Sequence, residues 1–149
     1  MALDPQTLAA LAPTQFVALL KRTPDAEIRR DFEGEHRTAL LDAIFQRFPE
    51  QFRPEKAGDR SARIDFRITG GPGGSSDTYA VVVADGACVV EKGSGAEPDL
   101  SLMMGPLEFL KVITGTGNPA MMFMMGKLKA KGDLGIAGGL ANWFEPPTR

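Results

Sequence analysis

Residues 118–134 read NPAMMFMMGKLKAKGDL, and this stretch contains the start of a helix, its end and a strand. Asn118-Pro119 is a cap residue followed by proline at the first helical position, which predicts a short helix over Ala120–Met125. Gly126 is the residue type that most often ends a helix. The next five residues, Lys127–Lys131, alternate between lysine and apolar side chains, so we expect a short strand there.

The segments on either side of this stretch also have the patterns of regular structure. Downstream, Gly132-Asp133 predicts a turn that caps a final helix from Leu134 to about Phe144. Upstream, Asp99–Met104 has the pattern of a strand, and Gly105-Pro106 opens a helix that continues to about Thr114. The last third of the chain therefore mixes strands with helices.

The middle of the sequence has a period of two residues. Apolar and polar residues alternate over Arg63–Thr69, which predicts a strand buried on one face only. The buried face would consist of Ala62, Ile64, Phe66 and Ile68. Two further strands are predicted over Thr78–Ala84 and Ala87–Glu91, and the Asp85-Gly86 pair between them is a strong hairpin signal. Residues 60–92 should form a three-stranded antiparallel meander that is covered on one face.

The N-terminal part of the chain has helical patterns. Thr14 and Thr23 are candidate cap residues at helix starts. Apolar residues in 35–48 recur every three or four positions, which predicts an amphipathic helix that Pro49 ends. Residues 54–59 are expected to be a linker. The chain as a whole is predicted to be α+β, with a five-stranded sheet and helices on one side.

The composition is that of an ordinary globular domain, and it argues against several classes of function. The 149 residues are 43% apolar and 24% charged. The net charge of −2 is evenly distributed along the chain, which argues against a nucleic-acid-binding protein. No apolar run is long enough for a membrane-spanning helix, and the first residues lack the basic region of a signal peptide. We therefore expect a cytoplasmic protein.

Residues that could carry catalysis or bind a metal are few. The sequence has one cysteine, Cys88, and one histidine, His36, so a zinc site built from these residue types is close to excluded. Gly70–Gly74 and Gly126-Lys127 lack the remaining residues of a phosphate-binding loop. The acidic residues are scattered, without the pairing that a glycosidase needs. We predict no cofactor, no metal and no catalytic residue.

Methionine is the most informative residue type in this sequence. Six of the seven methionines lie between residues 103 and 125. Methionine adapts to irregular or changing apolar shapes, so the cluster indicates either an ordinary core with a surface or dimer patch, or a deformable lipid pocket. Lys127, Lys129 and Lys131 lie on one face of the expected strand. That row indicates either a solvated face or weak attraction to an anionic membrane.

Several motifs of the sequence occur together in one known family. In chain order they are Gly71-Pro72-Gly73-Gly74, Asp99–Leu102, Phe109-Leu110, Asn118-Pro119, Phe123, Gly126-Lys127-Leu128-Lys129 and Gly132-Asp133-Leu134. Their order and spacing agree with those of the sterol carrier protein 2 (SCP2) domain, a lipid-transfer module. Residues from about 35 to 145 resemble this domain.

The resemblance implies a fold and a function. The fold is a five-stranded mixed, mainly antiparallel sheet with helices packed on one face and an apolar tunnel between them. The tunnel would hold a fatty acyl chain, fatty acyl-CoA, sterol or phospholipid, without a cofactor or catalytic residues. Residues 1–33 would be an N-terminal helical extension to a domain over 34–145, with a tail over 146–149. The residues expected to line the tunnel are Leu102, Met104, Phe109, Ile113, Met121, Met124, Leu134 and Ile136.

Alternative functions and partners remain open at this point. The chain could be a protein-interaction module whose methionine-rich surface binds a partner, or an accessory subunit of a lipid-metabolising enzyme. Residues 1–33 could cover the tunnel mouth or mediate a homodimer. The expected partners are a lipid or fatty acyl ligand and, transiently, a membrane surface, with no nucleic acid.

Overall fold

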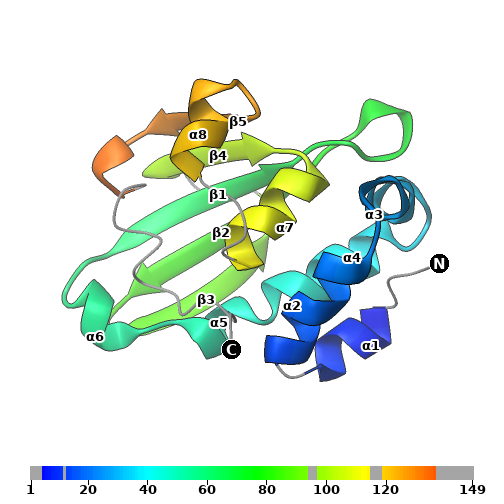
Figure 1. Ribbon diagram of the computed structural model, residues 1–149. Helices are drawn as coiled ribbons and strands as arrows, with labels where there is room; N and C mark the ends of the chain where they lie inside the picture. Colours follow the sequence, from blue (N-terminus) through cyan, green and yellow to red (C-terminus); the bar gives the residue numbers. More distant parts are fainter. Residues whose placement is uncertain (1–4, 12, 94–96, 115–118, 137–149) are drawn as a thin grey trace.

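A five-stranded sheet organises the molecule (Figure 1). The structure is a computed structural model that describes residues 5–11, 13–93, 97–114 and 119–136. In spatial order the strands are β3 (Ala87–Lys92), β2 (Asp77–Ala84), β1 (Ala62–Ile68), β4 (Leu100–Met104) and β5 (Leu128–Gly132). Only the pairing of β1 with β4 is parallel among these strands, and the other three pairings are antiparallel. The predicted mixed, mainly antiparallel sheet is therefore confirmed.

The local signals in the meander act as the sequence predicts. Ala62, Ile64, Phe66 and Ile68 are all buried on one face of β1, whereas Arg67 is exposed on the other. Asp85 and Gly86 join β2 to β3, and both have positive φ angles, of 54° and 74°. Two positive φ angles in a two-residue loop give the turn whose twist matches that of paired strands.

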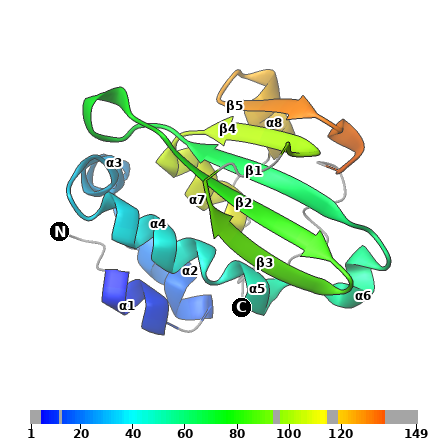
Figure 2. The same ribbon diagram turned by 180° about the vertical axis from the view of Figure 1, so that it is seen from behind.

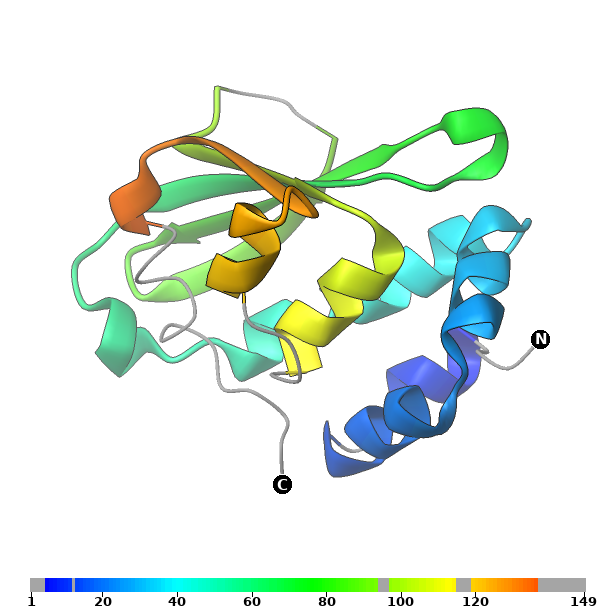
Figure 3. The ribbon, with the colours of Figure 1, turned by 45° about the horizontal axis from the view of Figure 1, so that its top comes forward.

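The described helices lie on one face of the sheet (Figures 1 and 3), and none of them lies in front of the other face in Figure 2. Their bounds are α1 (Pro5–Ala10), α2 (Pro13–Arg22), α3 (Asp25–Glu33), α4 (Arg37–Phe45), α5 (Phe48–Gln51), α6 (Pro54–Ala57), α7 (Pro106–Thr114) and α8 (Pro119–Met124). A 3-10 turn over Pro72–Gly74 lies in the loop between β1 and β2. No helix in the described part of the chain is long and apolar enough to cross a membrane.

Three expectations for the N-terminal helices are wrong in detail. The helix expected over 35–48 is two helices, and Pro49 lies in the first turn of α5, where its missing N–H costs nothing. The expected linker at 54–59 contains α6. The hydroxyl of Thr23 does not cap α3, because it donates instead to the carbonyl oxygen of Leu19, at 2.6 Å, and Pro24 occupies the cap position.

The N-terminal helices and the sheet share one hydrophobic core. Phe16, Ile28 and Phe32 are almost completely buried and belong to the same cluster as the inner face of the sheet. Arg47 of the loop between α4 and α5 donates to the carbonyl oxygen of Leu11, at 2.9 Å, and its guanidinium carbon lies 4.7 Å from the centre of the Phe16 ring. The segment before α4 is therefore packed against the rest of the chain.

Candidate functional site

The inner faces of β4 and β5 are apolar and face the helices. Leu102 and Met104 of β4 are buried, with 7% and 2% of their surface exposed. Across the antiparallel pairing, Leu102 lies beside Ala130 and Met104 beside Leu128. Ala130 is half-buried and has a short side chain, so this edge of the sheet presents less side-chain volume than the strands at its centre.

Helix α8 packs against β5, whereas α7 lies in front of β1 and β2 in Figure 1. Phe109 and Leu110 of α7 are buried, and Ile113, one turn further along, is half-buried against the same core. Met122 of α8 is buried, with 9% of its surface exposed. The described residues of β4, β5, α7 and α8 that belong to the core are apolar, and most of them are aliphatic or methionine.

Aromatic rings fill the neighbouring part of the core, beneath β1 and β2. The ring of Phe45 lies 4.2 Å from that of Tyr79 and 4.9 Å from that of Phe109, centre to centre, and both pairs are stacked. Phe48 and Phe66 complete the cluster, with centres 5.1 Å and 5.8 Å from that of Phe45. The core thus has a rigid aromatic end and an end of flexible aliphatic side chains, and Phe109 lies where the two meet.

The residues expected to line a tunnel fall into three groups by burial. Leu102, Met104 and Phe109 are buried, and Ile113 and Ile136 are half-buried against the core. The exposed group is Met121 at 58%, Met124 at 83% and Leu134 at 56%. The first two groups lie between the sheet and the helices, and the third lies on the outer surface.

Two further apolar residues, which the sequence did not predict as tunnel residues, lie beside this third group. Phe123 and Met125 are 48% and 63% exposed. Met121, Met124 and Met125 have the spacing that places side chains on one face of a helix, and this spacing was the available signal. A helix of six residues is too short for its apolar pattern alone to tell which face is buried.

The turn into the last described helical residues matches the sequence prediction. The Oδ1 atom of Asp133 accepts a hydrogen bond from the backbone N–H of Gly135, at 2.9 Å, as a cap residue does. Residues 134–136 are helical. The rest of the expected helix to Phe144 lies outside the described residues, and so does the expected tail.

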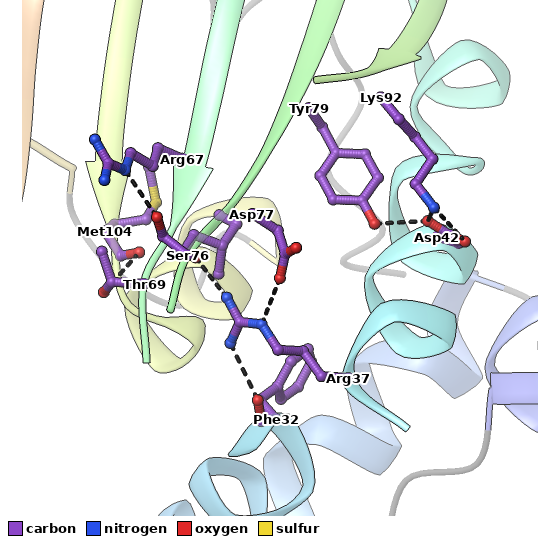
Figure 4. A network of polar contacts seen from close by, with 11 residues as sticks. Phe32, Arg37, Asp42, Arg67, Thr69, Ser76, Asp77, Tyr79, Lys92 and Met104 are labelled. Atoms are coloured by element: carbon purple, nitrogen blue, oxygen red, sulfur yellow. Dashed lines mark hydrogen bonds and ion pairs between the residues drawn. The ribbon is translucent and has the colours of Figure 1, made fainter. Parts of the chain in front are cut away.

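A polar network joins α4 to the sheet (Figure 4). The Nε atom of Arg37 donates to Asp77 at 2.6 Å, and its two terminal nitrogens donate to the carbonyl oxygens of Phe32 and Ile68. Arg37 is 3% exposed. Its guanidinium charge is therefore neutralised within the protein, and its hydrogen bonds hold α3 and α4 against the hairpin of β1 and β2.

A second part of the network centres on Asp42, also drawn in Figure 4. The Tyr79 hydroxyl donates to Asp42 Oδ1 at 2.6 Å, and Lys92 Nζ lies 3.2 Å from the same carboxylate. Burial first, and then the hydrogen bond and the charge of Asp42, raise the pKa of Tyr79 above its ordinary value. The neutral Tyr79 hydroxyl donates to a carboxylate that is already paired with Lys92, so this arrangement stabilises the fold and does not supply a base.

The one histidine and the one cysteine of the sequence lie in different surroundings. His36 is exposed and lies 3.6 Å from Glu35, which is itself exposed. Burial raises the pKa of the half-buried Cys88 thiol to about 11. Within the ranges that the structure describes, no three His, Cys, Asp or Glu side chains are grouped as metal ligands.

Comparison with known proteins identifies relatives for this arrangement. Residues 41–145 match the SCP-2 sterol transfer family. The chain is 38% identical to sterol carrier protein 2 from Homo sapiens over 77 residues, which are 52% of this chain and 14% of the human protein. The chain therefore spans about one seventh of the length of that relative.

Solved structures share the fold at lower sequence identity. The structure of palmitated SCP2L2 from Aedes aegypti is 20% identical with a TM-score of 0.56, over 66% of this chain and 88% of that one. The sec-alkylsulfatase Pisa1 from Pseudomonas sp. is 14% identical with a TM-score of 0.64, over 89% of this chain and 20% of that one. These likenesses concern the fold alone.

Proposed function

Because the chain belongs to the SCP-2 sterol transfer family, we propose that it binds and carries a lipid in an apolar tunnel between its sheet and its helices. The ligand is a fatty acyl chain, fatty acyl-CoA, sterol or phospholipid, held without a cofactor and without catalysis. We further propose that 34–145 form the lipid-binding domain and that 1–33 act as a helical extension. The extension packs beside α4 and α7, away from β5 and α8 in Figures 1 and 3, so its role in this proposal is support.

One observation carries the proposal: the side chains between β4, β5, α7 and α8 are apolar and adaptable. Leu102, Met104 and Ile113 belong to this region, and none of the buried polar residues that the structure describes lies on these four elements. A lipid tail needs apolar walls and few polar anchors. Met104, which pairs with Leu128 one step along the same face from Ala130, has a flexible side chain that can shift to admit chains of different shape.

The free energy of binding favours a carrier that releases its ligand. Burying a sixteen-carbon chain from water would contribute roughly 12 kcal/mol before the costs of association, at about 0.8 kcal/mol per CH₂. A lipid that leaves a bilayer gains almost nothing from this term, because membrane and tunnel are similar solvents. Transfer is then near balance, and fit rather than polar bonding selects the ligand.

Acyl chains are the first ligand class to test. The neighbouring structure from Aedes aegypti is of a palmitated protein, and the aliphatic end described above suits a long unbranched chain. Native mass spectrometry of protein purified without detergent, with lipid extraction from the same sample, should detect a bound fatty acid or phospholipid. A protein that is empty, and that also fails to bind added fluorescent acyl chains and a fluorescent sterol, would refute the carrier function.

A space-filling substitution tests where the ligand binds. Ala130→Phe places a ring between the sheet and the helices, and we expect it to abolish acyl-chain binding while the melting temperature falls little, because the ring occupies ligand space. Ala87→Phe is the matched control, since Ala87 is exposed on the other face of the sheet. If Ala130→Phe instead unfolds the protein, the region is already filled and the proposed site is wrong.

The alternative function is an accessory lipid-binding part of a larger enzyme system. Two comparisons favour this alternative. The match covers only 14% of sterol carrier protein 2 from Homo sapiens, and the fold shared with the sec-alkylsulfatase makes up 20% of that chain. Assays of the purified protein for turnover of acyl-CoA or alkyl sulfate test the absence of catalysis, which both functions share. Turnover would contradict the non-catalytic proposal, and ligand binding without turnover would support it.

A further inference from the structure

Four large apolar side chains lie exposed on and after α8. They are Met121, Phe123, Met124 and Met125, with 58%, 48%, 83% and 63% of their surfaces exposed, and we name them the methionine patch. Single exposed apolar residues are ordinary, but four within five positions are a local concentration. Since Met122 alone in that run is buried, packing against β5 fixes the helix so that its neighbours face outward.

Three lysines follow the methionine patch along the edge of the sheet. Lys127, Lys129 and Lys131 are all exposed, and none of them pairs with an acidic group in the part of the chain that the structure describes. Leu128 and Ala130 face the helices, so Lys129 and Lys131 lie on the opposite face of β5. We name these three residues the lysine row.

The two features meet at one edge of the molecule. β5 is the outermost strand on its side of the sheet, so its free edge lies between α8 on one face and Lys129 and Lys131 on the other (Figures 1 and 3). Residues 119–136 contain three lysines and one acidic residue, Asp133. This edge is therefore locally positive in a chain whose net charge is −2.

We propose that this edge docks on an anionic phospholipid bilayer, with the methionine patch at the interface and the lysine row among the headgroups. Lysine stems can extend along apolar surface while their charges reach phosphate. Apolar and basic side chains together are the combination that binds negatively charged membrane surfaces. This inference adds a partner to the proposed carrier function and does not require that the chain hold a ligand.

Charge favours a bilayer over a second copy of the chain. Two copies joined edge to edge would bring two lysine rows together, and lysines on an edge strand oppose such pairing. A bilayer that carries negative headgroups is complementary to the row. The flexible methionines also suit a fluid surface that offers no fixed shape.

Vesicle flotation of the full chain tests the proposal directly. We expect binding to vesicles of phosphatidylcholine with a minority of phosphatidylserine, weaker binding to phosphatidylcholine alone, and loss of binding at high salt. The triple variant K127Q/K129Q/K131Q should lower the partition coefficient about a hundredfold, at about fivefold per lysine. M121S/M124S/M125S should lower it at least about tenfold even at low salt.

A second triple variant controls for net charge. Lys21, Arg29 and Arg30 are exposed on α2 and α3, so K21Q/R29Q/R30Q removes the same charge far from β5. The proposal is overturned if this control loses as much affinity as the lysine-row variant, or if the wild type ignores anionic vesicles. Dimerisation through the methionine patch without vesicle binding, seen by sedimentation, would also overturn it. Acyl-chain binding measured without vesicles tests the carrier function separately, because neither the lysine-row variant nor the K21Q/R29Q/R30Q control changes a residue that is expected to line the tunnel.

Discussion

The guanidinium of Arg37 lies 2.6 Å from the carboxylate of Asp77, and this pair joins two segments that are 40 residues apart in the chain. Arg37 begins α4, and Asp77 begins β2. The arginine also donates to the carbonyl oxygens of Phe32 and Ile68. One buried side chain therefore connects α3, α4, β1 and β2.

Replacing Arg37 by methionine should destabilise the fold by about 2–3 kcal/mol, because two carbonyl oxygens and a carboxylate lose charged hydrogen bonds. Asp77→Asn should cost about 1 kcal/mol, since Asp77 is partly exposed and the amide can still accept from the guanidinium. Urea denaturation followed by circular dichroism measures both variants. Equal losses for the two would show that the bonds to the carbonyl oxygens contribute little.

Two glycines with positive φ differ in what surrounds them, and substitution by alanine should separate strain from crowding. At Gly126 (φ 76°) an added Cβ meets no atom within 4 Å, so Gly126→Ala should cost only about 1 kcal/mol of backbone strain. At Gly132 (φ 115°) the Cβ would collide with the backbone oxygen of Asp99 and lie 3.1 Å from the Cα of Leu100. Gly132→Ala should therefore cost about 3 kcal/mol or more. A melting temperature for Gly132→Ala equal to that of Gly126→Ala would contradict this.

The pKa of Tyr79 makes stability depend on alkaline pH. In the unfolded chain tyrosine ionises near pH 10, whereas burial and Asp42 keep the folded phenol neutral to higher pH. Above about pH 10 the unfolded state loses a proton that the folded state keeps, so the stabilising effect is complete below that pH and decreases above it. Tyr79→Phe should cost about 1–2 kcal/mol at neutral pH and remove this decrease. Tyr79 is the only tyrosine, so its ultraviolet absorbance reports its ionisation directly. Ionisation of the folded protein near pH 10 would disprove the shift.

Cys88 should react slowly with thiol reagents in the folded protein. The reactive species is the thiolate, and burial raises the pKa of this thiol to about 11 from an ordinary value of 9.0. A rise in the pKa from 9.0 to about 11 lowers the thiolate fraction at pH 8 about a hundredfold. Modification by iodoacetamide, measured by mass spectrometry against the urea-unfolded chain, should show at least that ratio of rates. Similar rates in both states would place the thiol in solvent.

Local patterns sufficed to predict the strands and most turns. Alternation in β1 and the Asp85-Gly86 pair acts over a few residues, so the sequence contains the whole signal for them. The fold class and the family followed from motifs of the same short range. The candidate tunnel residues remain a prediction, of which the structure places Met121, Met124 and Leu134 on the surface.

Features that depend on contacts between distant segments could not be predicted from local sequence patterns. The separation of α4 from α5 follows from packing, since the ring of Phe45 stacks on rings from α5, β2 and α7, and periodicity alone would continue the helix. The burial of Arg37 and Arg47 had no sequence signal, because a buried arginine and a solvated one look alike among scattered charges.

The sequence by itself determined the five strands, the apolar inner face of the sheet and the family, because each depends on neighbours within a few residues or on a motif of fixed spacing. Only the tertiary structure decided which methionines of α8 face outward and which charges are buried. Those outcomes depend on what each side chain contacts after the chain has folded. In α8, a helix of six residues, packing against β5 buries Met122 and leaves its neighbours exposed.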